Sequence, residues 1–563
     1  MITSLPPFAI FFTGALLLAL APARLQQLLL LLVPVITGLQ LLTIPDDQAI
    51  GIVAMGYDLV VHRTDRLSLL FGYIFTLAAF ISALFSLHLR DRLQHVAGMV
   101  YAGSALGAVF AGDLITLFVF WELAVISSVV LIWARRTQAS TAAGWRYLVI
   151  QFISGLLLLA GILIRFRETG SLAFTFIGLE GLSGWLIFLA FGIKCAFPLL
   201  HNWLTDAYPE ATPTGAVFLS AFTTKMAIYA LARGFPGTEA LIYIGAVMTC
   251  FPIFYAVLEN DLRRVLGYSL VNQLGFMVCG IGIGTALAIN GAVSHAFSHI
   301  IYKALLFMSL GAVLHMTGKI RCTDLGGLYK TMPVTTGLCI VGACSISAFP
   351  LFSGFVSKSM VMAAALQEGH DWIWLVLLFA SAGVFHHAGI KVPFFAFFAH
   401  DSGIRAKEPP LNMLLAMGLA AVLCVGIGTW PGLLYNLLPY PVEYSPYTAT
   451  HVIAQLQLLF FSALAFTWLK LTGLYPPEIR SVNIDTEWLY RRLGPRLAGR
   501  FGELADPWHI RIRNTLLKPL KEAYDTIMLY HGPHGILART WATGSMVLWV
   551  VILLGAYLVA YYY

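Results

Sequence analysis

The stretch GIKCAFP at residues 192–198 decides the fold, because it sets a lysine and a proline inside a long apolar run. The stretch PLFSGFVSK at residues 350–358 repeats that combination farther along the chain. Proline or glycine within a membrane span breaks the helical hydrogen-bond ladder and frees carbonyl groups. Membrane proteins tolerate such breaks where the backbone lines a polar cavity. Both stretches therefore predict broken membrane helices beside a polar interior.

The spacing of the lysines indicates an internal repeat. Lys225 lies 31 residues after Lys194, and Lys391 lies 33 residues after Lys358. A broken helix with a lysine thus precedes a second lysine-bearing helix twice. Repeats with binding groups on discontinuous helices are typical of transporters. Each copy would contain five spans, and because five is odd, the second copy is predicted to be inverted in the membrane.

Composition sets the class of protein. The 563 residues are 59% hydrophobic and 11% charged, with a mean hydropathy of +0.82, whereas soluble domains carry about 25% charged residues. About sixteen apolar stretches of roughly 17–25 residues could each cross a hydrocarbon core of about 30 Å. They are continuously apolar, which excludes a β-barrel. We predict an all-α polytopic membrane protein with about 14–16 transmembrane helices and two inverted five-helix repeats.

The predicted spans divide the chain into six parts. The first run lacks the basic start of a cleaved signal peptide, so we expect it to be a retained helix. The spans are residues 8–23, 26–45, 67–88, 96–111, 114–134, 145–165, 183–201, 214–233, 238–258, 266–287, 290–316, 333–366, 372–399, 411–433, 450–470 and 543–562. The predicted parts are N-terminal helices with an external hairpin loop (1–92), the two repeats (93–235 and 236–400), peripheral helices (401–474), a cytoplasmic amphipathic segment (475–541) and a final transmembrane helix (542–563).

Basic residues in the loops orient the chain. When loops are assigned alternately to the two sides, thirteen basic residues fall on one side and five on the other. This asymmetry indicates that the side with thirteen is cytoplasmic and that the N-terminus points outward. In the arginine-rich tail, Asp506–Tyr530 is predicted to be an amphipathic surface element divided by Pro519. Such an element either lies on anionic lipid headgroups or docks a partner.

Six charged residues remain inside predicted spans. Each costs at least about 2.5–3.5 kcal/mol to insert, so the group indicates a function, although a single lysine could instead reach a helix end or satisfy a packing pair. A buried lysine can release its proton near neutral pH, whereas an arginine stays charged. Lysines without arginines therefore favour a proton or ion path. The six are Glu122, Lys194, Lys225, Lys303, Lys358 and Lys391.

The stretch HAFSHIIYK at residues 295–303 adds histidines to this group. Its spacing of four places His295, His299 and Lys303 on one stripe of a helix. Two histidines four apart could bind zinc, but no third ligand is evident, so we predict a proton relay instead of a metal site, with structural packing as the alternative. The seven cysteines show no CxxC spacing, and no cofactor is predicted.

These residues resemble the antiporter-like subunits of respiratory complex I and of Mrp-type sodium/proton antiporters. The matching motifs are FWEL (120–123), the Lys194 segment running into HNWLTDA (201–207), NDLRRVLGYS (260–269), HAFSHIIYK (295–303) and SGFVSK (353–358). The stretches AYPEATP (207–213) and TKMAIYALAR (224–233) look most like the D subunit of Mrp-type antiporters. The resemblance implies that Glu122 and Lys194 form a coupled ion pair, that Lys225 and Lys303 form a central relay, and that Lys358 is the terminal site.

We therefore expect a proton-translocating membrane subunit of a multi-subunit Mrp-type sodium/proton antiporter in a bacterial inner membrane. Protons would pass along Lys194, Lys225, the 295–303 stripe, Lys358 and Lys391. Its expected partners are other hydrophobic subunits, protons, sodium and lipids, with no nucleic acid. The alternatives are a proton-pumping subunit of a complex I-like or hydrogenase redox complex (an NADH:quinone oxidoreductase-type translocase), an energising subunit for inorganic-carbon uptake, and a non-transporting scaffold.

Overall fold

The computed structural model describes residues 5–54, 56–480, 483, 485–538 and 542–563. The chain divides into two units, Met1–Asn483 and Ile484–Tyr563. Among the described residues, thirteen helices are long and apolar enough to cross a membrane, and three further apolar helices are shorter. The prediction of an all-α polytopic membrane protein is thus confirmed. The inverted relationship between the two five-helix segments stays a prediction.

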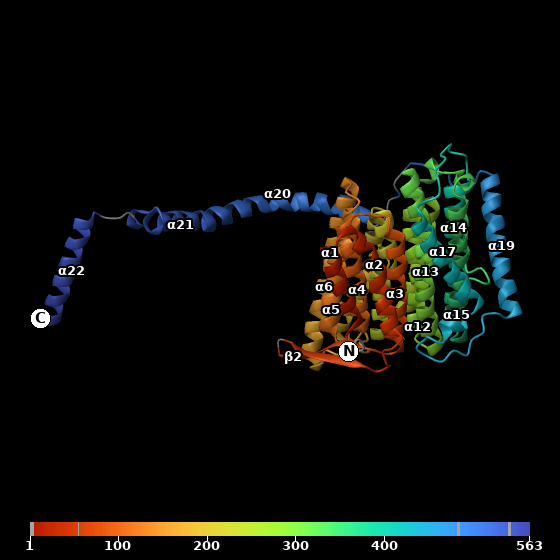
Figure 1. The fold of residues 1–563 in the computed structure, drawn as a ribbon, viewed down its shortest axis with the longest axis horizontal. Helices are drawn as coiled ribbons and strands as arrows, with labels where there is room; N and C mark the ends of the chain where they lie inside the picture. Colours follow the sequence, from red (N-terminus) through yellow and green to blue (C-terminus); the bar gives the residue numbers. More distant parts are fainter. Residues whose placement is uncertain (1–4, 55, 481–482, 484, 539–541) are drawn as a thin grey trace. The chain divides into compact units, whose positions relative to one another are not determined.

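The first unit is a bundle of helices with one β-hairpin (Figure 1). Strands β1 (Ala49–Ala54) and β2 (Tyr57–Arg63) pair antiparallel between α2 and α3, where the external hairpin loop was expected. The helices are α1 (Pro7–Leu20), α2 (Ala23–Leu41), α3 (Arg66–Ser86), α4 (Arg92–Phe110), α5 (Leu114–Trp133), α6 (Gln138–Thr169), α7 (Gly181–Cys195), α8 (Asn202–Ala207), α9 (Pro213–Ala221), α10 (Thr223–Gly234), α11 (Ala240–Leu258), α12 (Leu262–Ile283), α13 (Ala286–Thr317), α14 (Pro333–Ile346), α15 (Ser353–Gln367), α16 (Asp371–Val384), α17 (Leu411–Thr429), α18 (Gly432–Tyr435) and α19 (Ala449–Leu471).

Aspartates fix the start of several helices. The Asp65 carboxylate accepts the backbone N–H of Ser68 at 2.8 Å, and Asp113 accepts that of Thr116 at 2.7 Å. Asp261 caps α12 in the same way. An acidic residue at this position satisfies an unpaired backbone donor and complements the positive end of the helix dipole. The boundaries of α3, α5 and α12 therefore follow from one acidic residue placed before each apolar run.

Both predicted helix breaks are present. Helix α7 ends at Cys195, and Ala196 follows with a φ of 63°. The run 333–366 is divided into α14 and α15, and Ala348 and Leu351 in the connection have φ values of 57° and 75°. Positive φ is unfavourable for residues with a side chain. These breaks are therefore built into the backbone around the two lysine segments.

Two further interruptions were not predicted from the sequence. The run 214–233 was expected to be one helix, but α9 ends at Ala221 and α10 begins at Thr223, with Phe222 between them. The run 372–399 was also expected to be regular, but Phe385–Lys391 and Phe394–Phe398 are π-helical. Both interruptions lie beside predicted site residues, Lys225 in the first and Lys391 in the second, and π-turns of this kind are frequent at functional sites.

The charged loops gather at two opposite ends of the bundle. At one end, here the basic face, Arg135 donates to Glu210 at 3.0 Å and Arg263 donates to the Pro209 carbonyl at 2.9 Å. At the other end, here the outer face, Arg233 pairs with Asp65 beside the β-hairpin. Which of the two ends faces the cytoplasm stays a prediction.

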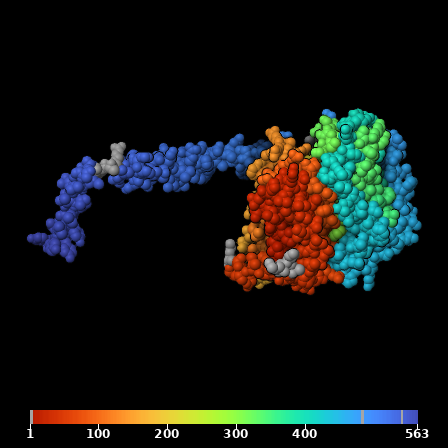
Figure 2. Space-filling model, viewed as in Figure 1, coloured from red at the N-terminus to blue at the C-terminus, as the bar shows by residue number. Residues whose placement is uncertain are grey.

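Helices α9, α10, α12 and α13 form the interior of the bundle. The segment Pro213–Gly234 and helices α12 and α13 are almost completely enclosed by other helices. Figure 1 shows α12 and α13 between the N-terminal helices and α14, α17 and α19. In Figure 2 the red N-terminal helices and the cyan segments after residue 330 cover the visible face of this unit. The interior helices carry Lys225, His295, His299 and Lys303.

The second unit contains a long helical run and the last span. The run consists of a π-segment (Leu489–Leu493), α20 (Gly494–Ile512), a second π-segment (Arg513–Leu517) and α21 (Lys518–His531), and α22 (Thr543–Tyr562) follows. The helical run begins before Asp506, where the amphipathic element was expected to start. The helical geometry changes beside Pro519: the π-segment ends at Leu517, and α21 begins at Lys518 with Pro519 in its first turn.

Candidate functional site

The predicted site residues lie in the interior of the first unit. The side chains of the five lysines and of the two α13 histidines are completely or almost completely buried, and Glu122 is half-buried. They come from α5, α7, α10, α13, α15 and the π-segment Phe385–Lys391. Charged groups are expensive in such surroundings unless polar neighbours stabilise them. The contacts of each residue therefore show what the arrangement can do.

Lys194 is held by the backbone of α5. Its Nζ donates to the Trp121 carbonyl at 2.9 Å and lies 4.3 Å from the centre of the Trp121 ring. The neighbouring carboxylate of Glu122 is within electrostatic range of Lys194. Among the described residues, Glu122 Oε1 is buried without a hydrogen-bond partner. The structure thus brings together the two residues that the resemblance pairs, and leaves the carboxylate free to accept a proton or a water.

Neighbouring helices clamp this pair. A methyl group in place of the Gly155 hydrogen on α6 would lie 1.8 Å from Glu122 Oε1, so the carboxylate packs directly against the α6 backbone. Trp121 Nε1 donates to Ser154 Oγ at 3.1 Å, and Ser154 donates to the Ala190 carbonyl of α7 at 2.7 Å. These contacts join α5, α6 and α7 around Glu122 and Lys194.

Lys225 uses a carbonyl that the α9–α10 break makes available. Its Nζ donates to the Ser220 carbonyl at 2.6 Å. In a continuous α-helix, that carbonyl would accept the N–H of residue 224. The Cys195 thiol, next to Lys194 in the chain, is within electrostatic range of Lys225. The segment of Lys194 and Cys195 at the end of α7 therefore lies near Lys225.

The α13 stripe contains groups without direct partners. Lys303 Nζ and both ring nitrogens of His299 have no hydrogen-bond partner among the described residues. His299 is within electrostatic range of Lys225, Lys303 and Lys358. Buried polar groups are nearly always hydrogen-bonded to protein or ordered water. This position in the middle of the bundle therefore suits water molecules that pass protons between amines and imidazoles.

His295 and Lys358 connect α13 to the second broken helix. His295 Nδ1 lies 3.0 Å from Ser357 Oγ. Lys358 donates to the Ile346 carbonyl at 3.0 Å and lies 5.1 Å from the Phe276 ring centre. Ile346 is the last residue of α14, so this acceptor, like that of Lys225, lies at a helix break.

Lys391 lies toward the basic face. Its Nζ donates to the carbonyls of Val257 at 2.5 Å and Glu259 at 2.8 Å, at the end of α11. Glu259 also lines a polar hollow of about 230 Å³ on the basic face. Lys391 is thus the predicted residue that connects the interior with that face. The other residues around this hollow are Glu210, Asn260, Asp261, Arg264, Arg321 and Arg480.

His387 was not among the predicted site residues, although at most one residue of the His386-His387 pair was expected to share a helix stripe with Lys391. The His387 imidazole is buried beside the Gly383 backbone, and it is within electrostatic range of Lys303 and Lys391. Its neighbour His386 instead packs against Phe466 and Tyr475. The HH pair before Lys391 was a signal in the sequence, but a regular helix could not show which histidine faces inward.

A second missed group surrounds Tyr302. The Tyr302 hydroxyl donates to Gln273 Oε1 at 3.0 Å, and Gln273 Nε2 donates to Asn272 Oδ1 at 2.7 Å. The hydroxyl is also 3.5 Å from His295 Nε2. Adjacent amides inside the apolar run of α12 were the available signal. They place further polar groups beside the α13 stripe.

The contacts show which of these groups are neighbours. Glu122 lies near Lys194, and His299 is within electrostatic range of Lys225, Lys303 and Lys358. His387 is within electrostatic range of Lys303 and Lys391. The amines rest mainly on carbonyls and aromatic rings. Amines and imidazoles held in this way can take up and release protons in turn.

The sequence is similar to a family of membrane domains and to subunits of known antiporters. The family described as "NADH:quinone oxidoreductase/Mrp antiporter, TM" matches residues 111–385. The A subunit of the Na(+)/H(+) antiporter of Alkalihalophilus pseudofirmus is 29% identical over 431 residues, which are 67% of this chain and 53% of that relative. The D subunit from the same organism is 34% identical over 284 residues, 47% of this chain and 58% of that relative. The matches thus span little more than half the length of these relatives.

Two solved structures share the fold. One is titled "Structure of Mrp complex from Dietzia sp. DQ12-45-1b"; its chain is 22% identical, with a TM-score of 0.75, and the match covers 92% of this chain and 62% of that one. The other is the membrane-bound sulfane sulfur reductase, described as an archaeal respiratory membrane complex. Its chain is 21% identical, with a TM-score of 0.72, and the match covers 99% of this chain and 100% of that one.

Proposed function

We propose that this chain is a proton-translocating subunit of a multi-subunit antiporter. The premise is that residues 111–385 belong to the family of NADH:quinone oxidoreductase and Mrp antiporter membrane domains. The antiporter would exchange protons for sodium or another monovalent cation across a bacterial inner membrane. One observation carries the proposal: the buried titratable groups from Glu122 to Lys391, here the series, lie in and around the most enclosed helices of the bundle.

The proposed transfer begins at the Glu122–Lys194 pair. With Glu122 ionised, the ammonium of Lys194 is stabilised by that carboxylate, by the Trp121 carbonyl and by the indole ring. Protonation of Glu122 removes the attraction, so Lys194 more readily gives up its proton toward Lys225. The pair would therefore set when a proton enters the series.

The groups in the middle of the series would hold the proton and pass it on. Lys225 has one carbonyl acceptor, while Lys303 and His299 have none among the described residues. A positive charge on one of these groups raises the energy of a charge on the next, so a proton arriving at Lys225 would displace one from Lys303. His387 would then pass it to Lys391 and the hollow on the basic face.

The names of the relatives support the exchange of sodium. The A and D subunits from A. pseudofirmus are named as parts of a Na(+)/H(+) antiporter. The buried groups of this chain handle protons, and a cation route in a partner subunit would complete the exchange. Because the matches cover only part of those relatives, the exchange itself remains part of the proposal.

A second candidate is a subunit of a redox-driven complex. The observation in its favour is that the chain from the sulfane sulfur reductase is matched over its entire length, whereas the Mrp chain is matched over 62%. The same lysines would then serve a pump that is driven by electron transfer in partner subunits.

Isolation of the intact complex separates the two candidates. The chain is captured in mild detergent, its partners are identified by mass spectrometry, and proton movement is followed in vesicles on addition of sodium. Small hydrophobic partners with sodium-dependent proton movement support the antiporter. Iron–sulfur or flavin partners with sodium-independent pumping support the redox candidate. Recovery of the chain alone, without partners, contradicts both.

A further inference from the structure

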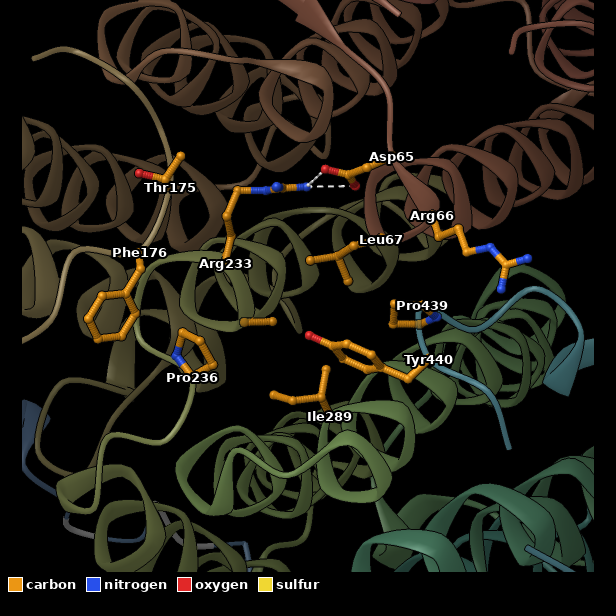
Figure 3. A pocket seen from close by; sticks show the side chains of 11 residues that line it. Asp65, Arg66, Leu67, Thr175, Phe176, Arg233, Pro236, Ile289, Pro439 and Tyr440 are labelled. Atoms are coloured by element: carbon orange, nitrogen blue, oxygen red, sulfur yellow. Dashed lines mark hydrogen bonds and ion pairs between the residues drawn. The ribbon is translucent and has the colours of Figure 1, made fainter. Parts of the chain in front are cut away.

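A hollow of about 410 Å³ opens on the outer face (Figure 3). It forms where the start of α3, the connection before α7, the end of α10, the start of α13 and the segment after α18 meet. Leu67, Phe176, Ile289 and Tyr440 give it largely apolar walls. The hollow thus lies at the junction of the two predicted five-helix repeats, and the series of buried groups described above does not include it.

An ion pair borders the hollow. Arg233 Nη2 donates to both carboxylate oxygens of Asp65, at 2.8 and 2.7 Å, as Figure 3 shows. Arg233 Nε also donates to the Tyr229 hydroxyl at 2.8 Å. The Asp65 carboxylate is meanwhile held by the Ser68 N–H at the start of α3. The pair therefore joins the end of α10 to the start of α3.

One face of α10 leads from this pair to the interior. Lys225, Tyr229 and Arg233 are spaced by four residues, so they form a stripe along the helix with a rise of about 6 Å at each step. Tyr229 is buried and is packed against the rings of Phe71 at 5.4 Å and Phe174 at 6.2 Å. Its hydroxyl accepts from Arg233 Nε and therefore keeps its own proton to donate.

We propose that this hollow is the outer mouth of the proton path, and that the Asp65–Arg233 pair is the gate between the mouth and Lys225. The inference rests on the proposed function and specifies where that function meets the outer face. With the pair closed, the guanidinium and the aromatic rings around Tyr229 exclude water. When the pair opens, water reaches Tyr229, and a proton can move between Lys225 and the hollow. The alternative is that the pair only ties two helices together.

The first test measures access and does not depend on transport. Ile74→Cys places a buried thiol one helical turn past Phe71 on the same face of α3 and leaves the rings around Tyr229 in place. Its reaction with a membrane-impermeant methanethiosulfonate is measured from the outer side of the intact complex, with the unsubstituted chain as background. We expect Asp65→Asn to raise the rate by about tenfold or more. The matched control is Glu210→Gln, which breaks the Arg135 ion pair on the basic face and should leave the rate unchanged.

Two results of the access test would overturn the gate. Equal rates with and without Asp65→Asn mean that the pair does not control access. Ala83→Cys, buried farther along α3, should remain unreactive in the Asp65→Asn background. If it becomes as reactive as Ile74→Cys, loss of the pair has loosened the whole helix, and the role of the pair is structural.

The second test plugs the hollow. Thr175→Cys places a label inside the hollow, and Val53→Cys places the same label on the exposed β-hairpin of the same face. We expect labelling at Thr175→Cys to reduce proton movement by about fivefold or more, and labelling at Val53→Cys to leave it unchanged. Equal proton movement after labelling at either position would show that the hollow is not the outer mouth of the proton path. If the unlabelled complex moves no protons, the proposed function fails, and the access test still decides whether the pair is a gate.

Discussion

The ammonium of Lys225 lies 2.6 Å from the carbonyl oxygen of Ser220, across the break between α9 and α10 at Phe222. The break in the helix therefore frees the Ser220 carbonyl to accept a hydrogen bond from the buried ammonium of Lys225. Lys358 uses the same arrangement at the α14–α15 break, where it donates to the carbonyl of Ile346. In both places, a buried lysine donates a hydrogen bond to a carbonyl at a helix break.

The first prediction concerns Lys225→Arg. Arginine keeps the positive charge but does not release its proton, so proton movement should fall at least tenfold, as we also expect for Lys225→Met. The matched control is Lys330→Met, because Lys330 is exposed and pairs with Asp401 outside the series. Proton uptake by vesicles that contain the intact complex measures the effect. Normal uptake by Lys225→Arg would show that this position needs only a charge.

The second prediction separates stability from function at Lys303. Its ammonium has no hydrogen-bond partner among the described residues, so Lys303→Met should remove a cost of about 2.5–3.5 kcal/mol at most. The thermal midpoint of the detergent-solubilised complex should rise by roughly 2–4 °C, while proton movement is lost.

Lys358→Met is the comparison for this variant. Lys358 has a carbonyl acceptor, the Ile346 oxygen, so its replacement should stabilise the complex less. Differential scanning fluorimetry of both variants makes the comparison. A lower midpoint for Lys303→Met would show that protein contacts stabilise the ammonium, and would contradict the assignment of a water-filled step.

The third prediction concerns the packing of Glu122. The added methyl group of Gly155→Ala would meet Glu122 Oε1 at 1.8 Å, so the flexible carboxylate should turn away from its position near Lys194. We expect proton movement to fall by about tenfold to a hundredfold, with little change in the thermal midpoint. Gly418→Ala on α17 is the control, because its methyl group would meet no atom within 4 Å. Equal proton movement in Gly155→Ala and Gly418→Ala would show that transport does not depend on the position of Glu122.

The fourth prediction concerns pH and the β-hairpin. Burial lowers the pKa of His62, which packs on Phe110, from 6.5 to about 4. Because the folded hairpin keeps the imidazole neutral, the unfolded state binds more protons between these values. The stability of the hairpin should therefore be complete above pH 6.5, decrease as the pH falls toward 4, and then level off. The total change is about 3 kcal/mol at most.

Hydrogen exchange of residues 49–63 at pH 7 and pH 5, corrected for intrinsic exchange, measures this loss. His62→Phe keeps the ring contact with Phe110 and removes the titration, so its protection should not depend on pH in this range. Equal pH dependence in His62→Phe and the unsubstituted chain would assign the effect to another group.

The sequence was sufficient for the class of fold and for most members of the series. Unpaired charges in apolar runs are visible without a structure, and they identified Glu122 and the five lysines. Proline and glycine marked the breaks near Lys194 and Lys358, because these residues disturb a helix by their own covalent geometry. The predicted start of α5 at residue 114 agrees with the structure, whereas α12 begins at Leu262, four residues before the predicted start at residue 266.

The other features depend on tertiary packing. The break at Phe222 contains neither proline nor glycine, and it is maintained by contacts such as the Lys225–Ser220 bond. The π-segment before Lys391 is equally silent in the sequence, and its wider turn determines that His387, and not His386, faces Lys303. The Asp65–Arg233 pair joins residues 168 positions apart. No local pattern predicts such a contact.

The most direct test of the account is sodium-driven proton release from inverted membrane vesicles that contain the whole complex, with and without Lys194→Ala. Respiration first acidifies the vesicle interior, and a fluorescent pH probe follows the release of protons when sodium is added. We predict release with the unsubstituted chain and none with Lys194→Ala at equal abundance of the assembled complex. Undiminished sodium-driven release in Lys194→Ala would contradict the claim that the buried lysines of this chain carry the proton.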